Sequence, residues 1–183
     1  IDHEILSSGG GTEEDVKQEF SKLLRPLQDL VSGFDFVTVV TKYYEGYVGH
    51  NEELQSSALR WLRAEYSTKT EARQALGVRN IIDDADVYDS LKLLSAFVRL
   101  AGYAGLLVIF DEMVNIYKLQ SSQARNQNFE QILRILNDVL QGNAEGIGFV
   151  FGGTPEFLMD SRRGLYSYQA LHSRLAENSF ATD

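Results

Sequence analysis

Apolar side chains recur every three or four residues over most of the first hundred positions, which is the period of an amphipathic helix. Val, Thr and Tyr in segment 34–47 favour a strand by propensity, but their spacing follows the helical period, and we interpret it as a helix. Proline lacks a backbone N–H and interrupts helices, so a break is expected at Pro26. The pattern predicts a strand end at Ile1–Leu6 and helices over about 12–31, 34–47, 52–66, 68–77 and 87–100.

The pattern changes after Gly105. Leu106–Phe110 and Ile147–Phe151 are apolar runs without alternation, which is typical of strands buried on both faces of a parallel sheet. A helix over about 123–140 separates them, so strand, helix and strand predict a parallel pair with a right-handed crossover. A last helix is expected around Ser167–Ala176.

Composition narrows the function classes. The chain has 183 residues, no cysteine and a net charge of −9. Without cysteine there is no disulfide, thiolate catalysis or Cys-ligated zinc, which suits the reducing cytoplasm. The acidic balance disfavours nonspecific nucleic-acid binding by this chain alone, because DNA affinity depends on Lys and Arg. No apolar stretch approaches the ~20 residues of a membrane helix, so no membrane partner is expected. Most of the negative charge lies in residues 1–112, whose net charge is −8.

The most specific motif lies at the end of the first apolar run, where Leu107–Phe110 leads into Asp111 and Glu112. Four apolar residues followed by Asp-Glu is the pattern of a Walker B strand, which delivers two carboxylates to the edge of the sheet where ligands bind. There Asp111 would hold the Mg²⁺ of the nucleotide, and Glu112 would act as the general base for the attacking water. The alternative is a strand that ends in two solvated acids.

The second apolar run ends in Gly152-Gly153-Thr154-Pro155. In P-loop ATPases with an additional strand beside Walker B, that strand ends in a polar sensor of the γ-phosphate, and Thr154 would supply the hydroxyl. The alternative is a turn residue in front of Pro155, which suits the first turn of a helix.

Three arginines follow this second run. An arginine often completes a nucleotide site by stabilising charge on the transferred phosphoryl group, in many assemblies from a neighbouring subunit. Arg174 in Ser-Arg-Leu fits that role, and the Arg162-Arg163 pair is the rival. The alternative for each is a surface ion pair with Asp160 or Glu177.

These residues together define the expected fold. We predict a helix-rich α/β protein with a P-loop NTPase-like parallel sheet, flanking helices and a large helical insertion. Residues 1–101 form an N-terminal strand remnant and helical region, and residues 102–183 form the Walker B and sensor part of the ATPase core.

Several separated motifs carry a resemblance to a known family, namely Trp61–Glu65, Leu76–Val78, Gly102–Leu107 with the run into Asp111-Glu112, Gly153–Phe157 and Arg162–Tyr168. Together they resemble the ATP-binding proteins of bacterial phage-exclusion (BREX) systems, a P-loop group related to AAA+ ATPases. The resemblance covers most of residues 50–178 and implies ATP, Mg²⁺, a cytoplasmic setting and a role in DNA-directed phage defence. It also implies a homo-oligomer or other defence proteins as partners, with DNA reached only through the full-length protein or its complex. It assigns Walker B roles to Asp111 and Glu112 and the sensor role to Thr154.

One motif of that family does not occur in these 183 residues. No Gly-x4-Gly-Lys-Ser/Thr sequence is present, and the chain begins at Ile1 rather than at methionine. A Walker A loop supplies most of the phosphate cradle through its amides and lysine. We therefore expect the chain to be the central to C-terminal part of an ATPase core, cut after the phosphate loop and inactive by itself.

Two other functions are compatible with the residues. One is a non-catalytic helical interaction module on a degenerate nucleotide-binding fold, whose acidic first half binds a basic partner. The other is a two-carboxylate nuclease built on Asp111 and Glu112, which lacks further convergent acids.

Overall fold

The computed structural model describes residues 13–175. The expected strand at Ile1–Leu6, the helix cap at Thr12 and the last predicted helical residue, Ala176, lie outside these residues. The chain divides at the Gly105–Leu106 bond into two compact units, and each is described by itself. Among the described residues, no helix has the length and apolar content needed to cross a bilayer.

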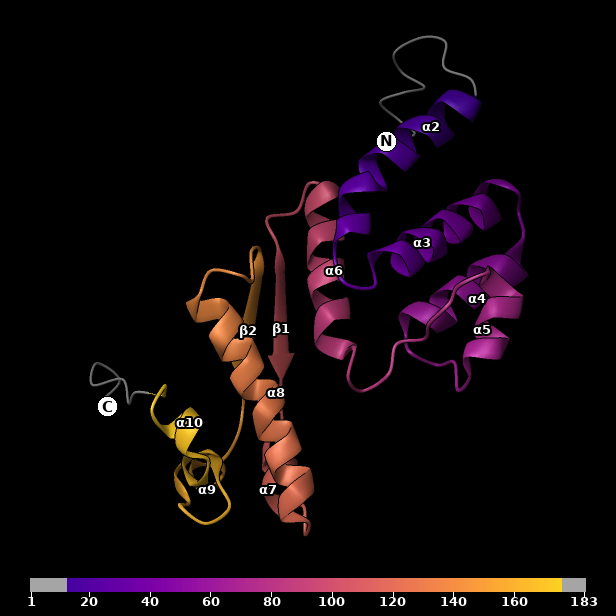
Figure 1. Ribbon diagram of the computed structural model, residues 1–183. Helices are drawn as coiled ribbons and strands as arrows, with labels where there is room; N and C mark the ends of the chain where they lie inside the picture. Colours follow the sequence, from indigo (N-terminus) through magenta and orange to yellow (C-terminus); the bar gives the residue numbers. More distant parts are fainter. Residues whose placement is uncertain (1–12, 176–183) are drawn as a thin grey trace. The chain divides into compact units, whose positions relative to one another are not determined.

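The first unit is helical, as the periodicity predicts (Figure 1). The predicted helix at 34–47 is confirmed, and Pro26 does interrupt the first helix, which continues as a 3-10 turn. Thr68 begins α5 by accepting a hydrogen bond from the Glu71 N–H, and Gly77 ends it with a φ of 76°. The elements are α2 (Glu13–Leu24), η1 (Arg25–Asp29), α3 (Gly33–Val48), α4 (Glu52–Leu62), α5 (Lys69–Leu76) and α6 (Val87–Leu100).

Helix α4 ends earlier than predicted, at Leu62 rather than Tyr66. Ala64 takes a left-handed conformation with a φ of 58°, and the Glu65 N–H donates back to the Arg60 carbonyl. This closes the helix and turns Tyr66 into the core of the unit, where its side chain is buried. The spacing of apolar residues does not reveal this early end of α4, because Tyr66 fits the helical period whether or not the helix continues to it.

A buried carboxylate connects α3 to the segment after α5. Asp35 is only 4% exposed, and its oxygens accept from the backbone N–H groups of Arg79 and Asn80, each at 3.0 Å. The Asn80 side-chain amide donates a third hydrogen bond at 3.2 Å. On the other side of the same segment, the Trp61 indole N–H donates to the Asn80 carbonyl at 2.8 Å. Because buried polar groups require partners, Asp35 fixes the path of a segment that has no regular structure.

The second unit contains both strands. β1 and β2 have the predicted bounds, and α8 lies within one residue of its predicted start. The last predicted helix is shorter than expected, since only four residues are helical after a separate 3-10 turn. The elements are β1 (Leu106–Phe110), α7 (Val114–Lys118), α8 (Ser122–Leu140), β2 (Ile147–Phe151), α9 (Pro155–Met159), η2 (Leu165–Ser167) and α10 (Gln169–His172).

β1 and β2 pair in parallel, with Leu106 opposite Ile147 and Phe110 opposite Phe151, which confirms the predicted pairing. In Figure 1, α8 runs alongside the two strands of this unit. The rings of Phe110 and Phe151 stack with centroids 5.4 Å apart and pack on a cluster that contains Phe129 and Ile132 of α8. This apolar face forms the core of the second unit.

The expectation that these strands are buried on both faces is wrong. Along β1, half-buried and exposed side chains alternate, and Leu107 and Ile109 are 62% and 66% exposed. In β2, Val150 lies opposite Ile109 and is also exposed. The strands therefore carry apolar side chains on both faces of the sheet, but within this unit only the face toward α8 is covered.

Replacing Asp35 with Asn should destabilise the first unit by about 2 kcal/mol, because an amide N–H₂ then faces donors that need an acceptor. Trp61 is the only tryptophan of the chain and is buried in the same unit, so its fluorescence during urea unfolding reports the change. Asp29→Asn removes the same charge from an exposed position and serves as the control. Equal stability of the two variants would contradict the account of Asp35.

Candidate functional site

The ends of β1 and β2 stay joined beyond the last paired residues. The Gly152 N–H donates to the Phe110 carbonyl at 2.7 Å, and the Met113 N–H donates to the Gly152 carbonyl at 2.9 Å. Met113 also buries its side chain in the core of the second unit. These bonds hold the Asp111-Glu112 dipeptide against the segment after β2, at the carboxyl ends of both parallel strands.

Gly152 leaves room for the Asp111 carboxylate. A Cβ atom at position 152 would lie 3.0 Å from Asp111 Oδ1, which is closer than side chains ordinarily approach. Asp111 Oδ1 also accepts from the Glu112 N–H at 2.7 Å. The Asp111 carboxylate is therefore bound by a backbone hydrogen bond at the edge of the sheet and remains exposed to solvent.

Glu112 has a left-handed backbone, with a φ of 54°. A non-glycine residue rarely adopts this conformation, and such positions are frequent at functional sites. The Glu112 carbonyl accepts from the Asn115 N–H at 2.9 Å, and its carboxylate Oε2 accepts from the Asn115 side-chain amide at 3.3 Å. Glu112 is exposed, so a solvent molecule or substrate can reach its carboxylate.

Thr154 lies at the same edge of the sheet, three residues after β2, and immediately precedes α9, where Pro155 is the first helical residue. Hydrogen bonds from its own backbone N–H and from the Thr154 hydroxyl lower the pKa of Glu156. The Thr154 hydroxyl makes no capping hydrogen bond to the backbone of α9, and its contact in this structure is with the Glu156 carboxylate. Its sensor role stays a prediction.

Arg163 is occupied by the protein itself. Its guanidinium Nη2 donates to the carbonyls of Tyr117 at 3.1 Å and Leu119 at 2.9 Å, at the carboxyl end of α7, where a cation is favoured. The group also lies over the Tyr117 ring, 5.4 Å from its centroid. This arrangement makes Arg163 a cap of α7, a role that the sequence does not distinguish from phosphate binding.

Asp160 organises the same corner of the unit. The backbone N–H of Arg162, the Tyr117 hydroxyl and the backbone N–H of Arg163 all donate to its carboxylate, and these bonds lower the pKa of Asp160. The same hydrogen bond to Asp160 raises the pKa of Tyr117. Asp160 was expected as an ion-pair partner of an arginine, but it binds their backbone amides.

Arg174 is bound by side-chain and backbone groups of its own unit. Its Nε donates to Asn137 Oδ1 at 2.8 Å, and Asn137 is near the end of α8. Because α8 returns the chain from the carboxyl end of β1 to the amino end of β2, its last turn lies at the opposite edge of the sheet. At about 1.5 Å per residue, Asn137 is roughly 20 Å along the helix from its start.

Arg162 differs from the other two arginines. Its backbone N–H binds Asp160, and its side chain is exposed. Within residues 13–175, the Arg162 guanidinium makes no hydrogen bond or ion pair, and its positive charge contributes to the lowered pKa of Asp160. It is therefore the candidate whose guanidinium is available to another molecule.

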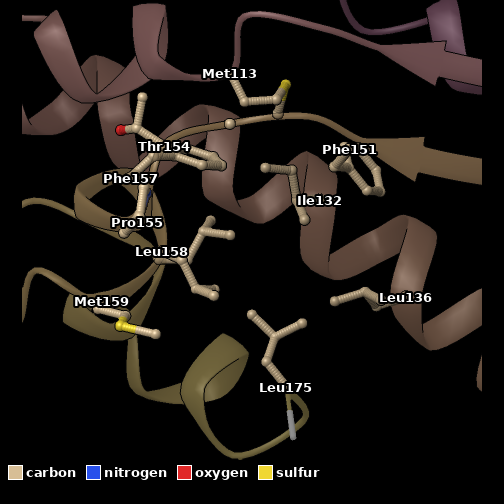
Figure 2. A pocket seen from close by; sticks show the side chains of 12 residues that line it. Met113, Ile132, Leu136, Phe151, Thr154, Pro155, Phe157, Leu158, Met159 and Leu175 are labelled. Atoms are coloured by element: carbon tan, nitrogen blue, oxygen red, sulfur yellow. The ribbon is translucent and has the colours of Figure 1, made fainter. Parts of the chain in front are cut away.

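An apolar pocket with a volume of about 410 Å³ lies beside Thr154. Figure 2 shows Ile132 and Leu136 of α8 facing the side chains of Leu158 and Leu175 across it. Gly153 forms part of the lining, and a Cβ there would lie 2.8 Å from the Phe157 ring. A side chain at these two successive glycines would therefore meet different groups, the Asp111 carboxylate at position 152 and the Phe157 ring at position 153.

Sequence reasoning selected Asp111 and Glu112 as candidates but did not predict the groups that contact them. Asn115 lies three residues after Glu112, a spacing that permits the contact, yet nothing in the sequence requires it. The need for a glycine at position 152 has a signal in the Gly152-Gly153 pair, whereas the capping role of Arg163 has none. Tertiary structure alone reveals which of three similar arginines is occupied.

The fold and site define a helix-rich protein with a small parallel two-stranded sheet and a pair of exposed carboxylates at its carboxyl edge. A family model described as BREX system ATP-binding protein BrxC/D matches residues 2–183. The chain belongs to this family, which confirms the resemblance and places it among the ATP-binding proteins of a phage-defence system. No curated protein and no solved structure matches the chain significantly.

The residues present are compatible with Mg²⁺ carried by a nucleotide. Magnesium is usually bound through one or two carboxylates together with substrate phosphates and water, not by an all-protein cage. Asp111 offers one exposed, oriented carboxylate of this kind. Within the described residues, no group of three or more His, Asp or Glu side chains is placed to hold a metal by itself.

Replacing Asp160 with Asn should lower the melting temperature at neutral pH. It should also remove the part of the loss of stability at acid pH that comes from protonation of Asp160. A carboxylate with a lowered pKa in the folded state stabilises above its unfolded value, near 3.8, and this contribution is lost as the pH falls through the folded pKa. Melting curves followed by circular dichroism should therefore converge for the two proteins at low pH.

The control for this comparison is Glu130→Gln, which removes an exposed carboxylate from α8 in the same unit. Its melting temperature should follow that of the unchanged protein at every pH. A difference between Asp160→Asn and the unchanged protein that stays constant with pH would show that the charge of Asp160 has no part in stability.

Proposed function

We propose that these residues form the Walker B and sensor part of an ATP-hydrolysing P-loop protein of the defence system. The observation that carries the proposal is the joined carboxyl edge of β1 and β2, where Asp111, Glu112 and Thr154 follow parallel strands. Ligands bind at this edge in open parallel sheets. A phosphate loop is also required for this chemistry, and none occurs in the 183 residues, so the assays below use the complete gene product.

Asp111 is the residue that would hold Mg²⁺. Its carboxylate is exposed and is kept in place by the Glu112 N–H and by the space at Gly152. A bound Mg²⁺ would neutralise negative charge on the phosphates of the nucleotide. Asp111 would contribute one carboxylate oxygen to the metal's coordination.

Glu112 is the proposed general base. A general base must reach the proton that it removes, and its carboxylate is exposed at the end of the strand next to Asp111. The carboxylate would accept a proton from the water that attacks the terminal phosphate. The positive φ of Glu112 is consistent with a backbone that is held in place for the position of this side chain.

Thr154 is the proposed sensor of the terminal phosphate. Its hydroxyl donates to the Glu156 carboxylate, and with a nucleotide bound it would donate to a phosphate oxygen instead. Both partners are anionic oxygen acceptors, so the hydroxyl remains a donor in either state. The exchange would couple the nucleotide to the first turn of α9.

Among the arginines, Arg162 is the best candidate to stabilise charge on the transferred phosphoryl group. Arg163 caps α7 and Arg174 binds Asn137, whereas the Arg162 side chain is exposed and available. We propose that Arg162 acts on the nucleotide of a neighbouring subunit. This requires a homo-oligomer, with other defence proteins as further partners and DNA bound by the complete assembly.

Glu112→Gln in the complete gene product should abolish ATP hydrolysis and leave ATP binding intact, because the amide keeps the shape of the side chain but cannot take a proton. Steady-state phosphate release measures the first quantity, and equilibrium binding of a fluorescent ATP analogue measures the second. Glu130→Gln, an exposed carboxylate on α8, is the matched control and should hydrolyse ATP normally. Unchanged turnover in Glu112→Gln would rule out the assignment of the base.

Arg162→Ala should reduce kcat by roughly 10³-fold, the lower end of the effect of an arginine that stabilises phosphoryl transfer. Arg73→Ala, which removes an exposed arginine from α5, is the control and should have normal turnover. Mixing Arg162→Ala with Glu112→Gln subunits tests action in trans, because mixed oligomers then contain sites with both functional groups. Recovery of turnover on mixing is expected, and no recovery would contradict action between subunits.

A non-catalytic interaction module is the second candidate function. The observation that favours it is an exposed apolar surface on the helical unit, where Val31 and Phe34 are 62% and 58% exposed. Large exposed apolar groups often mark binding surfaces. This function is preferred if the complete gene product neither binds nor hydrolyses ATP, and if Phe34→Ser abolishes its association with other proteins of the system.

A further inference from the structure

We propose that Asn115 is a positioning residue that sets the orientation of the Glu112 carboxylate. The inference rests on the proposed function of Glu112 and adds a second residue to the same site. It starts from one observation, that Asn115 contacts Glu112 through both its backbone and its side chain.

Neighbouring residues bind the backbone N–H, the backbone carbonyl and one carboxylate oxygen of Glu112. Its N–H donates to Asp111 Oδ1 at 2.7 Å, and its carbonyl accepts from the Asn115 N–H at 2.9 Å. The Asn115 amide then donates to one carboxylate oxygen, Oε2, at 3.3 Å. The two backbone bonds fix the main chain, and the side-chain bond restricts rotation of the carboxylate, which is otherwise an exposed and flexible group.

The turn that carries Asn115 is itself anchored. Met113, between Glu112 and Asn115, donates to the Gly152 carbonyl and buries its side chain in the core. Ile116, directly after Asn115, packs against the same core and donates to the Met113 carbonyl. Asn115 therefore presents its amide from a fixed base, and its own side chain is exposed on the side of Glu112.

An amide donor suits a base that must stay ionised. A hydrogen bond from a neutral N–H₂ orients a carboxylate without forming an ion pair with it. The contact engages one oxygen and leaves the second to accept the proton of the water. Losing the contact should therefore lower the rate of proton removal more than the affinity for nucleotide.

The isosteric change Asn115→Asp separates this role from a structural one. Aspartate keeps the size of the side chain and the backbone N–H bond to Glu112, but it replaces the donor with a like charge. We expect kcat for ATP hydrolysis by the complete gene product to fall by about 10- to 100-fold, a fraction of the roughly 10²- to 10⁴-fold contribution of a general base. KM and the dissociation constant for the ATP analogue should change by less than about twofold, since a group that acts only in the transition state affects kcat.

Asn128→Asp is the matched control. The Asn128 amide donates to the Ala124 carbonyl on the exposed surface of α8, so this change removes a similar donor away from the carboxylates. Its turnover should remain normal. Asn115→Ala, which lacks the added charge, should lower kcat less than Asn115→Asp and guards against a variant that fails to fold.

The outcomes distinguish this inference from the proposed function. If Glu112→Gln abolishes hydrolysis while Asn115→Asp and Asn115→Ala turn over normally, Glu112 is the base and the positioning role of Asn115 is wrong. If the Asn115 variants lose ATP affinity together with kcat, their effect is structural and the inference also fails. If Glu112→Gln hydrolyses ATP normally, both the proposed function and the role of Asn115 fall together.

Discussion

The hydrogen bonds that continue the β1–β2 pair past its last residues are the constraint on which the site depends. Without the Gly152 N–H to Phe110 and Met113 N–H to Gly152 bonds, Asp111 and Glu112 would lie on a free loop. With them, the backbone of the exposed Asp111-Glu112 dipeptide is held by the hydrogen bonds of the parallel strands and by the core on which they pack. Gly152 contributes to the site in two ways. Its backbone N–H and carbonyl make both of these hydrogen bonds, and it has no side chain to displace the Asp111 carboxylate.

Contacts with other parts of the second unit also stabilise the short helix α7. A five-residue helix has little stability of its own, yet three contacts hold it: the buried Met113, the Arg163 cap and the Tyr117–Asp160 hydrogen bond. Met113 directly precedes α7, whereas Arg163 and Asp160 come from a segment more than forty residues later in the chain. The residues that stabilise α7 therefore also hold Asn115 beside Glu112 at the end of β1.

Much of the fold was predictable from the sequence, because its signals are local. The helical period predicted α3 against the strand propensity of its residues, and the apolar runs gave the bounds of both strands. Features that depend on distant contacts were not predictable. The early end of α4 follows from a left-handed Ala64, and the exposure of Leu107 and Ile109 follows from which face α8 covers. The carboxylates could be found by motif, but the division of roles among Arg162, Arg163 and Arg174 depends on partners that only the fold supplies.

A structure of the complete gene product with Mg²⁺ and a nonhydrolysable ATP analogue tests the central claim most directly. The account predicts the metal at the Asp111 carboxylate, the terminal phosphate within hydrogen-bonding reach of the Thr154 hydroxyl, and the Glu112 carboxylate facing that phosphate through a water. Nucleotide bound elsewhere in the protein, with the carboxyl ends of β1 and β2 in contact with solvent only, would contradict it.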